Sequence, residues 1–283
     1  MNLFELSWRA TQQIAIVDEG HELAEGIDGW GSGFFIKYKG IRIFVTADHV
    51  VHYDDHDSSN EYGKRIGKDD HIFIITNVTD VNNQIGFQEI GGIYNFDEYK
   101  FPDLEEELTE DEIELYSIPD MKDCAFSFID ENQSFDIRTH DLNDIDSSEI
   151  VPKGIRKIFI PDEQFNLGSP SEICLVTGTV MNKLEVLDDG RKQINRGNVI
   201  HLDLMFSGKV NNDGDYIYNA PDHDRVLNSL WKGLSGAPAI GINGKLVGII
   251  VRAVCENNTI IVKPITEVLK YIDYAMTVEH LIN

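Results

Sequence analysis

The stretch that most constrains this chain is a tight turn followed by two apolar runs near its C-terminal end. Residues 232–238 read Lys-Gly-Leu-Ser-Gly-Ala-Pro, and the apolar runs at 239–242 and 246–251 enclose an Asn-Gly pair. Asn-Gly between apolar runs predicts a β-hairpin, because both residues accept the positive φ angles of a two-residue turn. Glycines around Ser235 permit a sharp bend that exposes its hydroxyl. The heptad by itself fits either a catalytic turn or a plain hairpin connection.

Other stretches give the chain a predominantly β character. Residues 34–38 and 41–46 enclose a Lys39-Gly40 turn and predict a second hairpin. Residues 8–17 fit either a first strand or a lead-in helix. Residues 265–276 carry apolar side chains at three- and four-residue intervals, which predicts an amphipathic helix. Further strands are predicted at residues 71–76, 84–90, 155–160, 172–178, 199–206 and 260–264, and a turn at 211–215.

The length of the chain allows one large β domain or two halves. At 283 residues it can bury a sizeable core. Residues 139–153 are polar and contain a proline near their end, which is typical of a linker. We therefore expect an N-terminal domain at residues 1–145 and a C-terminal domain at residues 146–283.

The acidic balance of the chain argues against two classes of partner. With 24 Lys and Arg against 49 Asp and Glu, the net charge is -25. Such a charge repels nucleic-acid phosphates and anionic membrane surfaces, so we expect neither nucleic acid nor membrane as a partner. There is no long apolar run and no basic, apolar N-terminal signal, and three cysteines stand without a CxxC pair. We therefore expect a cytoplasmic protein with reduced thiols.

Three segments raise the question of a metal or cofactor. Residues 28–33 are rich in glycine, but they lack the third glycine of a dinucleotide fingerprint and precede a strand. Residues 103–114 hold eight carboxylates at spacings unlike those of a calcium-binding loop. A polar cluster follows at residues 52–57 and fits a solvated loop better than a metal site; its members are His52, Asp54, Asp55, His56 and Asp57. We expect no metal and no cofactor.

A histidine and an aspartate stand at two further strand boundaries. His49 follows a predicted strand, and Asp123 opens an apolar one. A serine hydroxyl is a poor nucleophile at neutral pH, so it needs a base and a third group that orients the base. His49, Asp123 and Ser235 supply these residue types in the chain order His, Asp, Ser. Asp120 is the alternative to Asp123, but no small residue follows it as Ala125 follows Asp123.

Four strings together resemble the chymotrypsin-like (trypsin-fold) serine proteases. They are Gly-Ser-Gly-Phe at residues 31–34, Thr-Ala-Asp-His at 46–49, Asp-Cys-Ala at 123–125 and the heptad at 232–238. The resemblance implies an all-β fold of two antiparallel β-barrels packed side by side, with a C-terminal helix. The intervening loops resemble nothing in the family.

The resemblance also implies an activity, that of a serine endopeptidase. His49 and Asp123 from the first barrel would meet Ser235 from the second. Ser235 would attack a peptide carbonyl while His49 takes and returns the proton and Asp123 orients the imidazole. The backbone N–H groups of Gly233 and Ser235 would form the oxyanion hole.

Several positions depart from the secreted members of the family. Leu234 stands where those proteases carry an aspartate that pairs with a newly cut N-terminus, so that route of activation is not expected. Asp48 replaces a small residue, and Val251 replaces a serine that supports the aspartate. The differences resemble the protease domain of bacterial HtrA-like enzymes, here without a PDZ module. By the same resemblance, the substrate pocket is expected near Ser229, Val251, Arg252 and Ala253, with no carboxylate at its base to favour Lys or Arg.

Two other functions use the same residues. One is a protease-fold binding module that has lost activity, which Asp48 and Val251 beside the expected triad suggest. An esterase with the same triad is the other. A peptide or protein substrate is the expected partner, and a regulatory protein that assembles the oxyanion loop is a further hypothesis.

Overall fold

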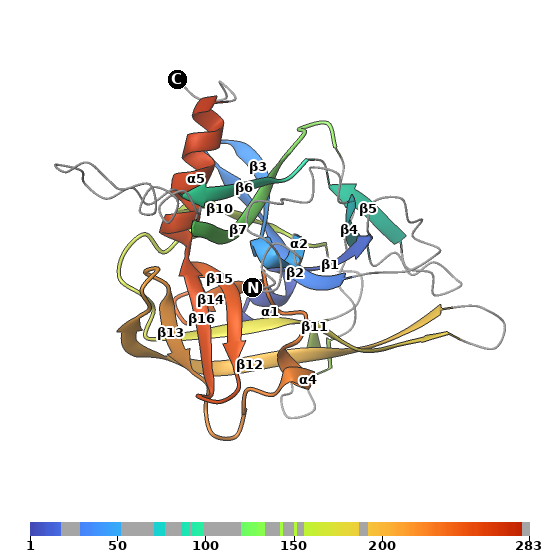
Figure 1. The fold of residues 1–283 in the computed structure, drawn as a ribbon, viewed down its shortest axis with the longest axis vertical. Helices are drawn as coiled ribbons and strands as arrows, with labels where there is room; N and C mark the ends of the chain where they lie inside the picture. Colours follow the sequence, from blue (N-terminus) through green and yellow to red (C-terminus); the bar gives the residue numbers. More distant parts are fainter. Residues whose placement is uncertain are drawn as a thin grey trace, which may run out of the picture.

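Six antiparallel strands of the C-terminal half close into a barrel (Figure 1). The computed structural model describes residues 1–17, 29–51, 71–76, 86–90, 92–98, 120–133, 142–143, 150–151, 156–186 and 192–278. The barrel runs in the order β11-β12-β13-β16-β15-β14 and closes where β14 pairs with β11. Its strands are β11 (Ile173–Val186), β12 (Lys192–Val210), β13 (Tyr216–Asn219), β14 (Pro238–Gly241), β15 (Leu246–Val254) and β16 (Thr259–Pro264). The predicted C-terminal barrel is confirmed, with β11 and β12 longer than their sequence patterns indicated.

The N-terminal half forms a second antiparallel sheet in the order β5-β4-β1-β2-β3-β7-β6. The short strand β10 (Phe159–Pro161) joins it by pairing in parallel with β2. Among the described strands the pairings form an open path, so closure into a second barrel stays a prediction, as does the division at residues 145 and 146. The strands are β1 (Thr11–Val17), β2 (Gly29–Tyr38), β3 (Ile41–Thr46), β4 (His71–Thr76), β5 (Gly86–Ile90), β6 (Tyr94–Glu98) and β7 (Asp120–Ile129).

The β2–β3 hairpin follows directly from its turn residues. Lys39 and Gly40 adopt φ angles of 49° and 85°, and Tyr38 pairs with Ile41 across the turn. Two consecutive positive φ angles belong to a primed turn, whose twist matches that of the two strands. The hairpin predicted from the sequence is therefore confirmed, and it carries β3 toward His49.

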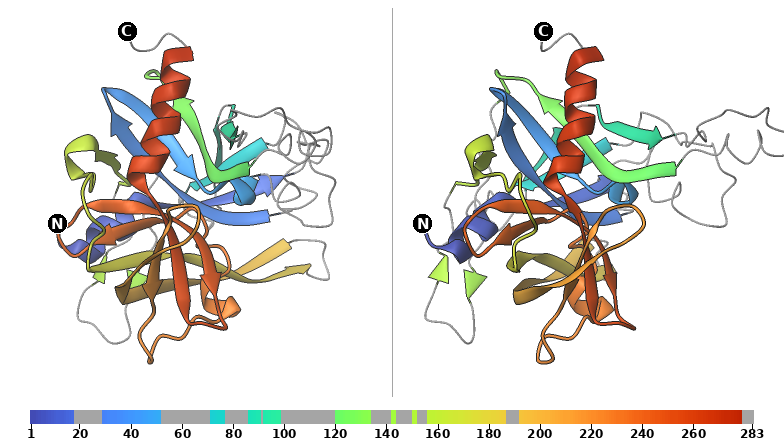
Figure 2. Two further views of the ribbon diagram at one scale, coloured as in Figure 1. Left: turned by 60° about the vertical axis from the view of Figure 1, so that its left-hand side comes forward. Right: turned by 90° about the vertical axis from the view of Figure 1, so that its left-hand side faces the viewer.

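The helix at each end of the chain packs on the half formed by the other end. The helix α1 (Leu3–Ala10) packs on the C-terminal barrel, where Ser7 Oγ lies 2.9 Å from Thr177 Oγ1. The helix α5 (Ile265–Val278) packs its apolar face on the N-terminal sheet, and Lys39 pairs with Asp273 at 2.8 Å. Both views in Figure 2 show this red helix beside the blue β2–β3 hairpin. Each half is thus held by a helix from the opposite end of the chain.

Residues 8–17 contain both of the structures that their pattern allowed. The helix α1 ends at Ala10, and β1 begins at Thr11. Lys157 Nζ donates to the carbonyl oxygens of Trp8 and Thr11 at this junction. Burial lowers the pKa of Lys157 to about 7, and the neighbouring Arg9 charge acts in the same direction. A side chain distant in sequence therefore binds the carbonyl groups where the helix gives way to the strand.

Three short helices and a small two-stranded sheet complete the described chain. The helices are α2 (Asp48–Val51), the 3-10 helix η2 (Asp162–Gln164) and α4 (Asn228–Trp231), and the sheet pairs β8 (Leu142–Asn143) with β9 (Ile150–Val151) inside the expected linker. The predicted turn at residues 211–215 is confirmed, because Asn211 Oδ1 accepts from the N–H of Asp213 and Asp215. No helix in the described ranges is long and apolar enough to cross a bilayer. The polar cluster at residues 52–57 and the acidic segment at 103–114 lie outside the described residues.

Candidate active site

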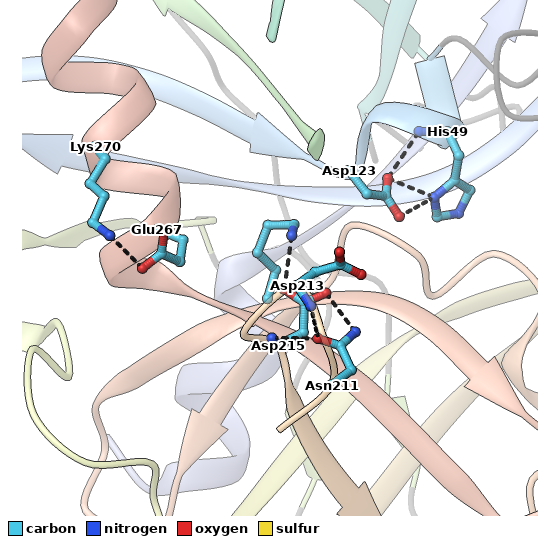
Figure 3. A network of polar contacts seen from close by, with 8 residues as sticks. His49, Asp123, Asn211, Asp213, Asp215, Glu267 and Lys270 are labelled. Carbon is cyan, nitrogen blue, oxygen red and sulfur yellow. Dashed lines mark hydrogen bonds and ion pairs between the residues drawn. The ribbon is translucent and has the colours of Figure 1, made fainter. Parts of the chain in front are cut away.

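His49 and Asp123 form a close pair at the edge of the N-terminal sheet. His49 Nδ1 lies 2.9 Å from each carboxylate oxygen of Asp123, and the backbone N–H of His49 donates to Asp123 Oδ1 at 3.1 Å (Figure 3). Because a carboxylate only accepts, it selects the tautomer with the proton on Nδ1. That tautomer leaves a lone pair on Nε2, the nitrogen that a general base needs.

Strand register brings these two residues together across 74 positions of sequence. Thr46, the last residue of β3, pairs with Ala125 of β7. Asp123 lies two residues before Ala125, so it extends past the end of β3. The helix α2, which carries His49, begins at this end of β3. Side-chain exposures of 29% for His49 and 25% for Asp123 leave the pair open on one side. The histidine thus sits at a strand end as the sequence indicated, but on the first turn of a short helix.

The residues that adjoin the pair are buried. Asp48 and Cys124 both have no exposed surface. Burial raises the pKa of the Cys124 thiol, and nearby carboxylates including Asp48 and Asp123 act in the same direction. The thiol is therefore protonated and inert. Cys174 is also buried, whereas Cys255 is exposed, and none of the three forms a disulfide.

Ser32 on β2 connects the serine turn to the strand that leads to His49. Its N–H donates to the carbonyl of Ser235 at 2.8 Å, and its Oγ donates to the carbonyl of Gly233 at 2.7 Å. Its own carbonyl accepts from Thr46 Oγ1 at 2.7 Å. Thr46 is three residues before His49. One residue of the N-terminal sheet thus holds the backbone on both sides of Leu234 and the end of β3.

Gly236 allows this close approach between the two halves. Its φ angle is 85°, a left-handed conformation that other residues adopt only with strain. A Cβ added there would lie 2.0 Å from the carbonyl oxygen of Ser32 and 2.4 Å from Thr46 Oγ1. The glycine after Ser235 is therefore required both by the bend and by the contact across the halves.

Backbone hydrogen bonds fix most of the serine turn but leave two N–H groups unused. The N–H of Leu234 donates to the carbonyl of Trp231 at 3.0 Å, and the N–H of Gly236 donates to that of Ile250 at 2.7 Å. Within the described part of the chain, the N–H groups of Gly233 and Ser235 donate no hydrogen bond. Two free donors on either side of Leu234 are what binding of a developing negative charge requires.

An apolar contact anchors the turn to the barrel. Leu234 is fully buried in the barrel core. A Cβ at Gly178 on β11 would lie 2.5 Å from Leu234 Cδ2, so the missing side chain at Gly178 makes the space that Leu234 fills. Packing therefore holds this position of the turn.

The residues expected to line a substrate pocket lie on two segments beside the turn. Val251, Arg252 and Ala253 follow Ile250 on β15, and they are buried, exposed and half-buried in that order. Ser229 belongs to α4, which leads into the turn. Their role as a pocket stays a prediction. The described residues hold no group of three or more His, Cys, Asp or Glu side chains that fits a metal ion.

Ser32 and Thr46 are the linking residues that sequence reasoning did not assign. Both lay inside the strings that carry the family resemblance, but nothing local marks their hydrogen bonds to Gly233, Ser235 and each other. Only the packing of the two halves shows them.

Comparison with known proteins finds similarity at the level of structure. No family model matches the chain, and no curated protein matches it in sequence. Among solved structures, the chain is similar to the serine endoprotease from Yersinia pestis, with a TM-score of 0.41 and 12% sequence identity. The alignment covers 97% of this chain and 66% of that chain, so this chain spans just under two thirds of its length.

Proposed function

We propose that this protein is a serine endopeptidase that cleaves peptide bonds through an acyl-enzyme intermediate. The observation that carries the proposal is the His49–Asp123 pair, in which Nδ1 lies 2.9 Å from both carboxylate oxygens. Ser32 links the end of the sheet that carries this pair to the serine turn through a hydrogen bond to Ser235. Ser235 is the nucleophile and His49 is the base. Neither residue type catalyses acyl transfer efficiently without the other.

Each step follows from where the protons sit. With Nδ1–H donated to Asp123, His49 Nε2 accepts the hydroxyl proton as Ser235 Oγ attacks the carbonyl carbon. The imidazolium that forms is stabilised by the Asp123 carboxylate, which stays ionised. His49 then gives the proton to the leaving amine, and water repeats the sequence to release the acyl group. Orientation of the base by such an aspartate contributes about 10⁴-fold to the rate.

The free N–H groups supply the second part of the mechanism. The tetrahedral intermediate carries a negative oxygen, and the donors of Gly233 and Ser235 are proposed to bind it. Each such donor contributes about 10²- to 10³-fold to kcat. Because hydrogen bonds on both sides fix this backbone, little reorganisation accompanies the reaction. A regulatory protein that acts on this turn stays a hypothesis.

The substrate class proposed is a polypeptide without a requirement for a basic side chain at the cleavage site. The proposed pocket of Ser229, Val251, Arg252 and Ala253 carries no carboxylate. A carboxylate at the pocket base is what pairs with Lys or Arg in proteases that prefer them.

A fluorophosphonate probe tests the nucleophile directly. We expect labelling of the wild type and of Ser169→Ala, an exposed serine remote from the proposed triad, and no labelling of Ser235→Ala. A peptide library should be cleaved by the first two proteins alone. Absence of labelling by any fluorophosphonate would contradict the proposal and favour a binding module. Turnover of p-nitrophenyl esters without cleavage of any peptide would instead identify an esterase.

A further inference from the structure

A second histidine is buried beside the serine turn, away from the proposed triad. His201 on β12 is 2% exposed. Its Nδ1 lies 2.7 Å from Asp224 Oδ2, and its Nε2 lies 3.1 Å from the carbonyl oxygen of Leu230. The carboxylate of Asp224 and the carbonyl of Leu230 are both hydrogen-bond acceptors, and they hold the ring from its two sides.

Asp224 is the charged group that contacts the ring in the described part of the chain. Its side chain is 18% exposed, so the pair is largely withdrawn from water. On β11, the residue opposite His201 is Val176, which carries no charge. The other charged or titratable residues close in sequence to the ring and its partners are all exposed; they are Asp203, Asp222, His223, Arg225 and Lys232. Loss of either partner leaves an uncompensated buried group.

The ring also stacks on Trp231, the last residue of α4. The two ring centroids are 3.8 Å apart with an angle of 16° between the planes, and Trp231 is 4% exposed. Stacking of two buried aromatic rings fixes their relative position and buries area on both. The carbonyl of Trp231 accepts from the N–H of Leu234 in the serine turn. His201 thus contacts two consecutive residues, Leu230 and Trp231, just before the backbone that carries Gly233 and Ser235.

We propose that His201 and Asp224 are positioning residues that hold residues 228–234, and with them the oxyanion N–H groups, in the geometry needed for reaction at Ser235. The inference rests on the proposed function. The pair contacts no reacting atom and acts through α4. Because the pair acts on the geometry of the turn, its loss should lower the maximal rate of reaction at Ser235 and leave the affinity for a probe nearly unchanged.

Three variants test this role in the full chain. His201→Phe keeps a ring on Trp231 but removes both hydrogen bonds, and Asp224→Asn removes the charge with little change in shape. His223→Phe is the matched control, because His223 is exposed in the same loop. The measurements are hydrogen exchange of peptides that span residues 228–236, with β15 as the internal reference, and the fluorophosphonate labelling rate as a function of probe concentration. The second measurement separates the affinity for the probe from the maximal labelling rate.

His201→Phe and Asp224→Asn should raise exchange in 228–236 but not in β15. Both should lower the maximal labelling rate about tenfold, as expected for loss of a hydrogen bond to a charged group, while the affinity for the probe stays near the wild-type value. His223→Phe should match the wild type in both measurements.

Wild-type exchange and labelling in Asp224→Asn would overturn the inference. If His201→Phe does not fold, Asp224→Asn decides. If the wild type never reacts with the probe, the proposed function fails. Exchange in 228–236 then decides whether His201 and Asp224 hold this segment.

Discussion

Substitution of Gly236 by alanine isolates the contact that joins the serine turn to the N-terminal sheet. At φ 85° a non-glycine residue costs about 1–2 kcal/mol in backbone energy. The added Cβ would also lie 2.0 Å from the carbonyl oxygen of Ser32, which is far inside contact distance. The turn and β2 must therefore separate.

That separation weakens two hydrogen bonds. Ser32 donates its N–H to the carbonyl of Ser235 and its Oγ–H to the carbonyl of Gly233. Each is worth about 0.5–1.5 kcal/mol. Together with the backbone cost, Gly236→Ala should lower the free energy of unfolding by about 2–5 kcal/mol. It should also slow fluorophosphonate labelling at least about tenfold, since a 1 Å displacement of reacting groups already has effects of this size or larger.

Gly40 offers a matched control for the backbone cost alone. Its φ angle is also 85°, but a Cβ there would meet nothing within 4 Å. Gly40→Ala should lower the free energy of unfolding by about 1–2 kcal/mol and leave labelling unchanged. Urea denaturation and labelling rates of the two variants are compared with the wild type. Equal destabilisation, with equal labelling at Ser235, would refute the claim that Gly236 marks the contact between the halves.

Three further predictions follow from the same structure. Asp123→Asn should reduce labelling of Ser235 about 10³- to 10⁴-fold with unchanged circular dichroism, because the neutral amide no longer selects the reactive tautomer of His49; a loss below tenfold would contradict the assignment. Leu234→Ala should lower the free energy of unfolding, measured in urea, by about 2–5 kcal/mol, because its fully buried side chain fills the space at Gly178; a smaller effect would show that the turn collapses to fill the cavity. Burial lowers the pKa of Lys157 to about 7 in the folded protein, so the unfolded chain binds more protons above that pH. The stability of the wild type relative to Lys157→Met should therefore rise between about pH 7 and pH 10. Urea melts at both ends of this range would show a flat or falling difference if the assignment is wrong.

Local patterns predicted the elements whose causes are local. The Lys39-Gly40 turn has two positive φ angles that its residues tolerate, and the apolar spacing of 265–276 gives a helix. By contrast, residues 8–17 could not be assigned, because their change from helix to strand depends on Lys157 at the carbonyl groups of Trp8 and Thr11. The barrel was expected from family resemblance, and its closure needs the pairings of β11 with β14 and of β13 with β16, which are not neighbours in the chain.

The sequence by itself determined which residues were available for chemistry: a histidine after a strand, an aspartate before an apolar run and a serine in a glycine-rich turn. Tertiary structure alone decided that the histidine and the aspartate form a pair. The register of β3 against β7 places Asp123 at the ring of His49, and Ser32 holds the serine turn at the same sheet edge. Tertiary structure also placed His201 between Asp224 and α4, a contact that no residue near His201 in the sequence indicates. The physical reason is that turn angles and helical or strand periodicity are encoded within a few residues. Hydrogen bonds between groups far apart in the chain, such as the one that Ser32 makes with Ser235 across 203 positions, exist only once both halves have packed.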